Sequence, residues 1–215
     1  MLILSLLQTN PIVALAFIAG LVAAITIHEF AHAFVAYRLG DPTAKLAGRL
    51  TLNPQSHLDP IGTLALLLVG FGWGKPTPFD PFNLRNIKRD SALISVAGAV
   101  SNFLMAIFLS LPYLIAYFTT NLTPTINSIY QVLSIVIWLN LILGVFNLIP
   151  IAPLDGFKVL AGLLPKDWYN DFIQTERYGM FILLFLLITG FIGRILFPIV
   201  SFLMQLLTPG FATPF

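Results

Sequence analysis

The chain has 215 residues, of which 58% are hydrophobic and 9% are charged. A soluble domain carries about 25% charged residues, so this composition excludes a water-soluble globule and indicates an integral membrane protein whose residues 1–215 form one all-α helical bundle. The net charge of +2 without a long basic run argues against a nucleic-acid partner, and the absence of cysteine excludes disulfides and thiolate metal ligands.

The first predicted membrane span covers residues 11–37 and contains the stretch "HEFAH" near its far end. Ionisable side chains are costly in hydrocarbon and usually functional there. His28 and His32 are four residues apart, so both lie on one helix face and can bind one Zn²⁺. Glu29 can take a proton from a metal-bound water. The alternative interpretation is a pair of packing histidines and a buried glutamate.

Residues 43–54 alternate modestly between apolar and polar side chains and predict a short β-hairpin or edge strand at the membrane surface. The apolar stretch 61–73 has only 13 residues and three glycines, which is short for a span and favours a re-entrant segment. Residues 74–90 are rich in proline and charge and predict a loop.

Three further spans are predicted at about 91–118, 128–149 and 178–193, the last with an apolar tail to residue 207. Two prolines in "NLIPIAPLDG" end the helical run after residue 147. Asp155 follows on this broken backbone and can approach another helix, which makes it a candidate for the third ligand that a zinc site needs. The alternative is that Asp155 only caps the next helix, at 156–164.

The basic residues indicate the orientation of the bundle. If 61–73 does not cross, ten of the eleven basic residues fall on one side, and the positive-inside rule then predicts a multi-pass protein of the cell membrane with its N-terminus outside and its basic loops in the cytoplasm. These ten are Arg38, Lys45, Arg49, Lys75, Arg85, Lys88, Arg89, Lys158, Lys166 and Arg177.

The motifs "HEFAH" and "NLIPIAPLDG", in this order, resemble those of the site-2 protease family of intramembrane zinc metalloproteases. The stretches "LNPQSHLDPIGT", "FGWGKPTPF" and "AGAVSNF" are similar to those of a compact prokaryotic subgroup that lacks PDZ and CBS domains. The resemblance covers most of the chain.

The resemblance implies one zinc ion per chain, with His28, His32 and Asp155 as its ligands. It implies that Glu29 is the general base and that Asn147 binds the substrate backbone or stabilises the oxyanion. The expected activity is hydrolysis of peptide bonds within or next to transmembrane segments of membrane proteins. The expected partners are therefore a transmembrane protein substrate and the lipid bilayer.

Two further residues have open roles. Asn102 ends a G-x-x-x-N pattern that starts at Gly98 and matches a family position, although plain helix packing explains the pattern equally well. His57 could be an auxiliary metal ligand, a substrate-gating residue or a loop histidine held by Asp59. The structural or gating roles are favoured, because Asp155 already completes a three-ligand site.

A substrate must unwind before cleavage, and its extended strand could pair with the predicted edge strand near 45–52. The re-entrant segment and the loop 74–82 could act as a gate. The competing class is a non-catalytic metal-binding membrane scaffold or an ion transporter. A transporter of this kind is expected to show internal symmetry, and the sequence shows no repeat.

Overall fold

The computed structural model describes residues 10–69, 72–119 and 124–209, and every regular element in these ranges is helical. Three helices are long and apolar enough to cross a membrane, and a bent helix pair adds a fourth candidate, so the chain is a multi-pass membrane protein. The elements are α2 (Pro11–Leu39), α3 (Thr43–Leu46), η1 (Pro54–Ser56), α4 (Pro60–Val69), η2 (Pro81–Asn83), α5 (Ile87–Thr119), α6 (Pro124–Asn147), α7 (Asp155–Leu163), α8 (Lys166–Gln174), α9 (Glu176–Ile188) and α10 (Phe191–Leu207).

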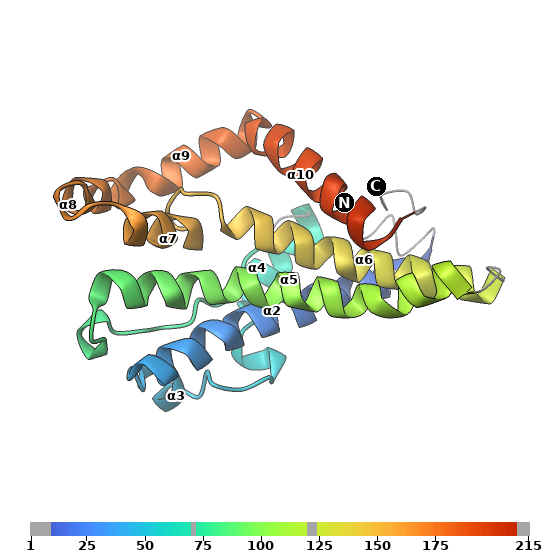
Figure 1. Cartoon of the computed structure of the whole chain (residues 1–215), viewed down its shortest axis with the longest axis horizontal. Coiled ribbons are helices and arrows are strands. Elements are labelled where there is room, and N and C mark those ends of the chain that lie inside the picture. The colour runs from blue at the N-terminus through green and yellow to red at the C-terminus, as the bar shows by residue number, and fades with distance from the viewer. Residues whose placement is uncertain (1–9, 70–71, 120–123, 210–215) are drawn as a thin grey trace.

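Helices α2, α5 and α6 pack against one another along the long axis of the molecule (Figure 1). Small side chains let the backbones of membrane helices approach closely. On α2 these are Ala14, Ala24, Ala33 and Ala36, all with no exposed surface. This three-helix core places the far end of α2 between the other elements. That end carries His28, Glu29 and His32, which we call the polar triplet.

Helices α9 and α10 form a pair bent by 75°, of which α10 packs against α6 and α9 extends over α7 (Figure 1). The break occurs at Gly190, which has a left-handed backbone with φ of 71°. The predicted span at 178–193 therefore does not continue as one straight helix, because its helix ends at Ile188. Buried side chains of both helices, including Leu183, Leu196 and Val200, join the core formed with α5 and α6.

The predicted β-hairpin within 43–54 is wrong. The structure places helix α3 at Thr43–Leu46 and a 3₁₀ turn at Pro54–Ser56, and no strand forms among the residues that it describes. Local capping explains the turn, because the Asn53 side chain accepts a hydrogen bond of 3.1 Å from the Gln55 N–H. Extended pairing in the described ranges is limited to one isolated bridge between Leu58 and Gly74.

Helix α4 occupies most of the stretch predicted to be re-entrant. Its ten residues extend about 15 Å, which is roughly half the hydrocarbon thickness of a bilayer. Residues 70–71 of that stretch lie outside the described residues.

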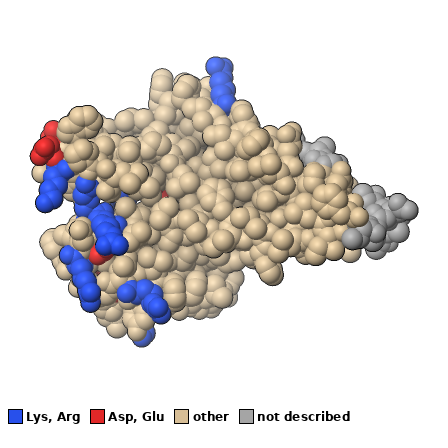
Figure 2. All heavy atoms as spheres, viewed as in Figure 1, with Lys and Arg blue, Asp and Glu red and all other residues tan. Residues whose placement is uncertain are grey.

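The cationic side chains visible in Figure 2 gather mainly at one end of the molecule. This is the end at which α3, α8 and the start of α5 lie in Figure 1. Little Lys or Arg is visible on the rest of this face, as expected for a protein with one charged end at the membrane boundary (Figure 2).

Candidate metal centre

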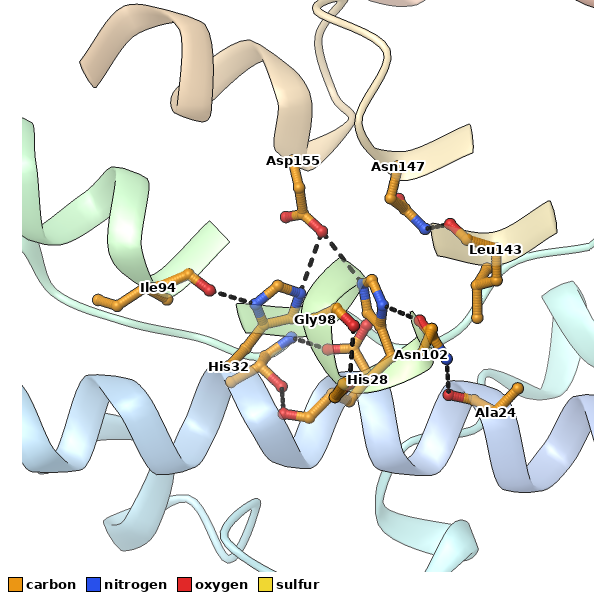
Figure 3. Close-up of polar contacts among 12 residues, drawn as sticks. Ala24, His28, His32, Ile94, Gly98, Asn102, Leu143, Asn147 and Asp155 are labelled. Atoms are coloured by element: carbon orange, nitrogen blue, oxygen red, sulfur yellow. Dashed lines mark hydrogen bonds and ion pairs between the residues drawn. The ribbon is translucent and has the colours of Figure 1, made fainter. Parts of the chain in front are cut away.

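Helix α2 supplies two imidazoles to one point in the core. His28 and His32 are 5% and 7% exposed, and their ring centroids are 4.6 Å apart. Spacing of one helical turn places the rings on the same face of α2, as the sequence predicts. This face points towards α5 and the start of α7 (Figure 3).

Asp155 comes to the same point from the first residue of α7. Its Oδ2 atom lies 3.1 Å from Nε2 of His28 and 3.1 Å from Nε2 of His32. The N-cap position of α7 belongs to Leu154 and no side chain caps this helix, so the Asp155 carboxylate faces the histidines and not its own helix (Figure 3).

The turn before α7 needs a glycine after Asp155. A Cβ atom on Gly156 would lie 2.3 Å from the Leu148 carbonyl oxygen and 2.4 Å from that of Ile149. Real Cβ atoms do not approach this closely, so only glycine lets the end of α6 fold back onto α7. This close return of the chain brings the Asp155 carboxylate over α2.

The outer nitrogens of both imidazoles contact groups that can only accept hydrogen bonds. Nδ1 of His28 lies 2.7 Å from Oδ1 of Asn102, and Nδ1 of His32 lies 2.7 Å from the Ile94 carbonyl oxygen. In the neutral imidazoles each Nδ1 therefore carries the proton and donates, and each Nε2 is left with a lone pair that can bind a metal ion. Metal-binding histidines are usually held in this way by carbonyl or carboxylate partners.

The three inner atoms fit a zinc ion. The ligand atoms of His28, His32 and Asp155 all lie within 4.8 Å of one another. Three hydrogen-bond acceptors gathered at one buried point repel one another, and a bound cation would stabilise them. Tetrahedral ligands at the usual Zn–N and Zn–O lengths are about 3.3–3.5 Å apart, close to the observed separations from Asp155. Two imidazoles and one carboxylate also match the donor set of catalytic zinc sites.

Gly98 of α5 lies directly beneath this cluster (Figure 3). A Cβ atom at this position would lie 2.5 Å from Nε2 of His32 and 2.6 Å from Nε2 of His28. Because glycine has no Cβ atom, room remains for the Nε2 atoms of the two imidazoles. This gives the G-x-x-x-N pattern a role beyond helix packing.

Glu29 is held by a segment outside the helices. Its carboxylate oxygen Oε2 accepts a hydrogen bond of 2.8 Å from the Thr77 N–H, and its carbonyl oxygen accepts one of 3.0 Å from the Thr77 hydroxyl. Thr77 lies between Pro76 and Pro78, which lack an N–H, so the Thr77 N–H is the single backbone donor of residues 76–78. We call residues 75–78 the proline segment.

The proline segment is itself fixed at Lys75. The Lys75 N–H donates to the His57 carbonyl oxygen at 2.8 Å, and the Arg49 guanidinium donates to the Lys75 carbonyl oxygen. Arg49 is 4% exposed, and burial lowers the pKa of its guanidinium while the nearby charge of Glu29 opposes that shift. The position of Glu29 thus depends on contacts that run through Thr77 and Lys75 to Arg49.

His57 lies away from the metal cluster, in the loop between η1 and α4. Its side chain has no exposed surface, and its Nε2–H donates to the Thr51 carbonyl oxygen at 2.7 Å. Asp59 caps the start of α4 instead of holding His57, because its Oδ1 atom accepts from the Gly62 N–H at 2.7 Å. The geometry is that of a loop histidine, with Thr51 as the partner in place of Asp59.

The two predicted asparagines differ in placement. Asn102 touches His28, as described above. Asn147 donates from Nδ2 to the Leu143 carbonyl oxygen of its own helix at 3.0 Å, and this bond turns its amide nitrogen away from the histidines (Figure 3).

Sequence reasoning missed two polar residues of the site. Thr77 lies in a proline-rich loop, where no periodic sequence pattern identifies it as a site residue. Asn140 lies in the middle of an apolar helix and bonds to Asn102, and a lone amide in a membrane span is a signal that could have identified it.

Comparisons with known proteins indicate the class of protein to which the chain is similar. The sequence profile described as Peptidase family M50 matches residues 16–190. YwhC of Bacillus subtilis is 41% identical over 84% of this chain and 84% of its own length, and Rip2 of Mycolicibacterium smegmatis is 30% identical over 85% of this chain and 70% of its own. Both are named as candidate zinc metalloproteases.

A more distant relative is named a zinc metalloprotease without that reservation. It is MJ0392 of Methanocaldococcus jannaschii, which is 28% identical over 77% of this chain and 39% of its own length. No solved structure matches the chain significantly.

Proposed function

The chain belongs to Peptidase family M50, the family of site-2 proteases, and is a zinc metalloprotease; on this premise we propose that it cleaves transmembrane proteins within or next to their membrane-spanning segments. The observation that carries the proposal is the convergence of His28, His32 and Asp155 on one buried point, with Glu29 adjacent in the chain. We propose that the bundle acts as a single catalytic domain.

The chain's own residues would divide the chemistry. A zinc ion bound by His28, His32 and Asp155 supplies Lewis-acid activation of a water molecule and of the scissile carbonyl group. Glu29 takes a proton from the attacking water and passes it to the leaving amine. Thr77 holds one carboxylate oxygen of Glu29, which leaves the other oxygen available for that proton.

We assign the oxyanion to Asn147, which lies at the end of α6, eight residues before Asp155. Its amide donates to the Leu143 carbonyl oxygen in this structure, so the side chain must turn towards the substrate to donate to the developing charge. We assign His57 to the loop that supports the proline segment, because its carbonyl oxygen holds Lys75.

An apolar groove beside the metal cluster supports a transmembrane substrate. Its volume is about 500 Å³, and it lies between α2 and α5. The α2 residues that line the groove lie between and beside His28, Glu29 and His32 in the sequence. One face of α2 would therefore contact a transmembrane substrate helix while another face holds the metal. The lining residues nearest to the triplet are Ile27, Phe30 and Ala31.

We propose that the N-terminus lies outside and that the basic end lies in the cytoplasm. The support is the gathering of Lys and Arg at one end of the molecule (Figure 2), which the positive-inside rule associates with the cytoplasmic side. Helix α4 is too short to cross, and a re-entrant course for 61–73 keeps these cations on one side. The HEFAH end of α2 then opens towards the cytoplasm, which supplies the water for hydrolysis.

The experiment compares the wild type with Glu29→Gln, with Glu176→Gln as the matched control because it removes the chain's other glutamate. Each protein is purified in detergent, its zinc content is measured, and it is incubated with a panel of transmembrane test substrates. We expect all three to hold about one zinc ion per chain and only Glu29→Gln to lose cleavage, by at least about a thousandfold.

Zinc binding without cleavage by the wild type, across a broad panel, would support a metal-binding scaffold instead. If the wild type holds no zinc, the assignment of the metal centre is wrong. Cleavage by Glu29→Gln at the wild-type rate would remove Glu29 from the role of base.

A further inference from the structure

We propose that Asn140 is a positioning residue for the metal centre: acting through Asn102, it fixes the tautomer with which His28 binds zinc. The inference rests on the proposed zinc site. Asn140 lies in the middle of α6, is 1% exposed and does not touch any of the three ligands itself. It belongs to a series of hydrogen bonds between buried amides that ends at His28.

This series of hydrogen bonds starts at the backbone of α6. Asn140 donates from Nδ2 to the Val136 carbonyl oxygen at 2.8 Å. A carbonyl oxygen can only accept, so this bond fixes which end of the Asn140 amide is nitrogen and turns its Oδ1 atom towards α5.

Asn102 has no exposed surface, and its amide nitrogen has two partners. It donates to Oδ1 of Asn140 at 3.0 Å and to the Ala24 carbonyl oxygen at 3.1 Å. Both partners accept, so both protons of the Asn102 amide are used and its Oδ1 atom must point the other way, towards His28.

The direction of these hydrogen bonds decides which ring nitrogen of His28 carries the proton. Oδ1 of Asn102 lies 2.7 Å from Nδ1 of His28 and can only accept from it. The proton of the neutral imidazole is therefore on Nδ1, and the lone pair is on Nε2, 3.1 Å from Oδ2 of Asp155. If the Asn102 amide turned over, its N–H would favour a lone pair on Nδ1, and the His28 proton would then block the metal-binding atom.

Asn140 makes that reversal unfavourable. With Asn140 in place, a reversed Asn102 would bring its oxygen against two acceptors, Oδ1 of Asn140 and the Ala24 carbonyl oxygen. Without Asn140, only the Ala24 carbonyl oxygen opposes the reversal. Asn102 has no exposed surface and Asn140 is 1% exposed, so bulk water does not reach this pair to compensate for a mismatched contact.

The test measures zinc affinity by competition with a chelator for Asn140→Leu, Asn140→Asp and the control Ser134→Ala. Asn140→Leu removes the acceptor, and we expect zinc to bind about tenfold more weakly, the lower end of the effect of outer-shell partners. Asn140→Asp in its neutral form keeps a carbonyl oxygen for Asn102 and an O–H for Val136, so we expect affinity close to that of the wild type. Ser134 is equally buried on α6 and bonds only to its own helix, and its replacement should change nothing.

A second readout follows the tautomer directly. The chain has three histidines, so the side-chain ¹⁵N signals of the metal-free protein can be assigned one by one. Nε2 faces the Asp155 carboxylate and can carry a proton in every variant when no metal is bound, so the discriminating atom is Nδ1. We expect a protonated Nδ1 on His28 in the wild type and in Asn140→Asp, and a measurable population without the Nδ1 proton in Asn140→Leu.

The inference is overturned if Asn140→Leu folds, binds zinc as tightly as the wild type and keeps the Nδ1–H tautomer. It is also overturned if Asn140→Asp loses as much affinity as Asn140→Leu, since the acceptor is then irrelevant. A wild type that binds no zinc instead refutes the proposed zinc site, which separates the two failures.

Discussion

The histidines and the glutamate of the HEFAH motif are held in place by different kinds of structure. We call the histidines and Asp155 the helical half of the site, and Glu29 with Thr77 its loop half. His28 and His32 are fixed by the packed helices α2, α5 and α7, through Asn102, the Ile94 carbonyl oxygen and Asp155. Glu29, between them in sequence, is held through Thr77 of the proline segment, which belongs to no helix. We therefore expect metal binding to depend on helix packing and the orientation of the proposed base, Glu29, to depend on a loop, so that the two should respond separately to mutation.

The largest expected effect on zinc affinity comes from Gly98→Ala, which acts on the helical half. The added Cβ atom would lie 2.5 Å from Nε2 of His32, so α5 must move away or the imidazole must turn. Overpacking of a close helix contact costs up to about 3 kcal/mol, so we expect zinc affinity to fall by roughly a hundredfold.

The measurement is zinc affinity in detergent, with Gly193→Ala on α10 as the control. A Cβ atom at Gly193 would meet only the Phe197 ring, at 3.1 Å, and no part of the site. Unchanged zinc affinity in Gly98→Ala would show that α5 is free to move and that its packing does not define the ligand geometry.

A smaller effect is expected from Thr77→Pro, which acts on the loop half. Proline removes the N–H that donates to the Glu29 carboxylate, and a hydrogen bond to a charged group is worth about 1.5–3 kcal/mol. We expect cleavage to slow by about tenfold or more with zinc content unchanged, measured as kcat on a transmembrane test substrate.

Thr77→Val is the matched control, because it removes the hydroxyl but keeps the N–H. It should cleave faster than Thr77→Pro. Equal loss in the two variants would contradict the role given to the N–H, and loss of zinc in Thr77→Pro would contradict the separation of the two halves.

The smallest effect on the site is expected from Asp41→Asn, just past the end of α2. Asp41 is fully buried, which alone would raise its pKa, but hydrogen bonds from Thr43, Asn83 and the Asp80 N–H outweigh burial and lower the pKa. These bonds tie the end of α2 to η2 and the loop that follows the proline segment. Replacing the carboxylate should destabilise the fold by about 2 kcal/mol while the zinc affinity stays the same.

The sign of the pH dependence follows from the lowered pKa. The folded form binds the Asp41 proton less readily than the unfolded chain does, so the stabilisation is complete above the unfolded pKa of about 3.9 and is lost as the pH falls through the folded value. Thermal unfolding between about pH 3 and 6 should show a wild-type decrease at the acid end that is smaller in Asp41→Asn. Parallel curves for the two proteins would remove Asp41 from this role.

The sequence predicted the helical half of the site well. Spacing of four on a helix brings His28 and His32 together whatever surrounds them, and a carboxylate after the two prolines that follow α6 marks Asp155. The three long spans were also predictable, because apolar runs longer than the bilayer thickness have one main interpretation.

The loop half was not predictable, because its contacts join residues far apart in sequence. Thr77 and Glu29 are 48 residues apart and share no local pattern. The alternation in 43–54 was misread as a hairpin, since Asn53 and the following proline favour a capped turn over strand pairing. The helix break at Gly190 was overlooked because apolar composition continues on both sides of it.

The distribution of the ligands along the chain has a consequence for biogenesis. Asp155 is 127 residues from His28, so the site joins α2 to the first residue of α7, after the turn that follows α6. A ribosome-bound chain inserted as far as α6 already exposes the HEFAH motif but lacks the carboxylate that completes the metal centre. We therefore expect the three-ligand metal centre to form only after most of the chain has been made, so that newly inserted chains do not cleave neighbouring membrane proteins during their own synthesis.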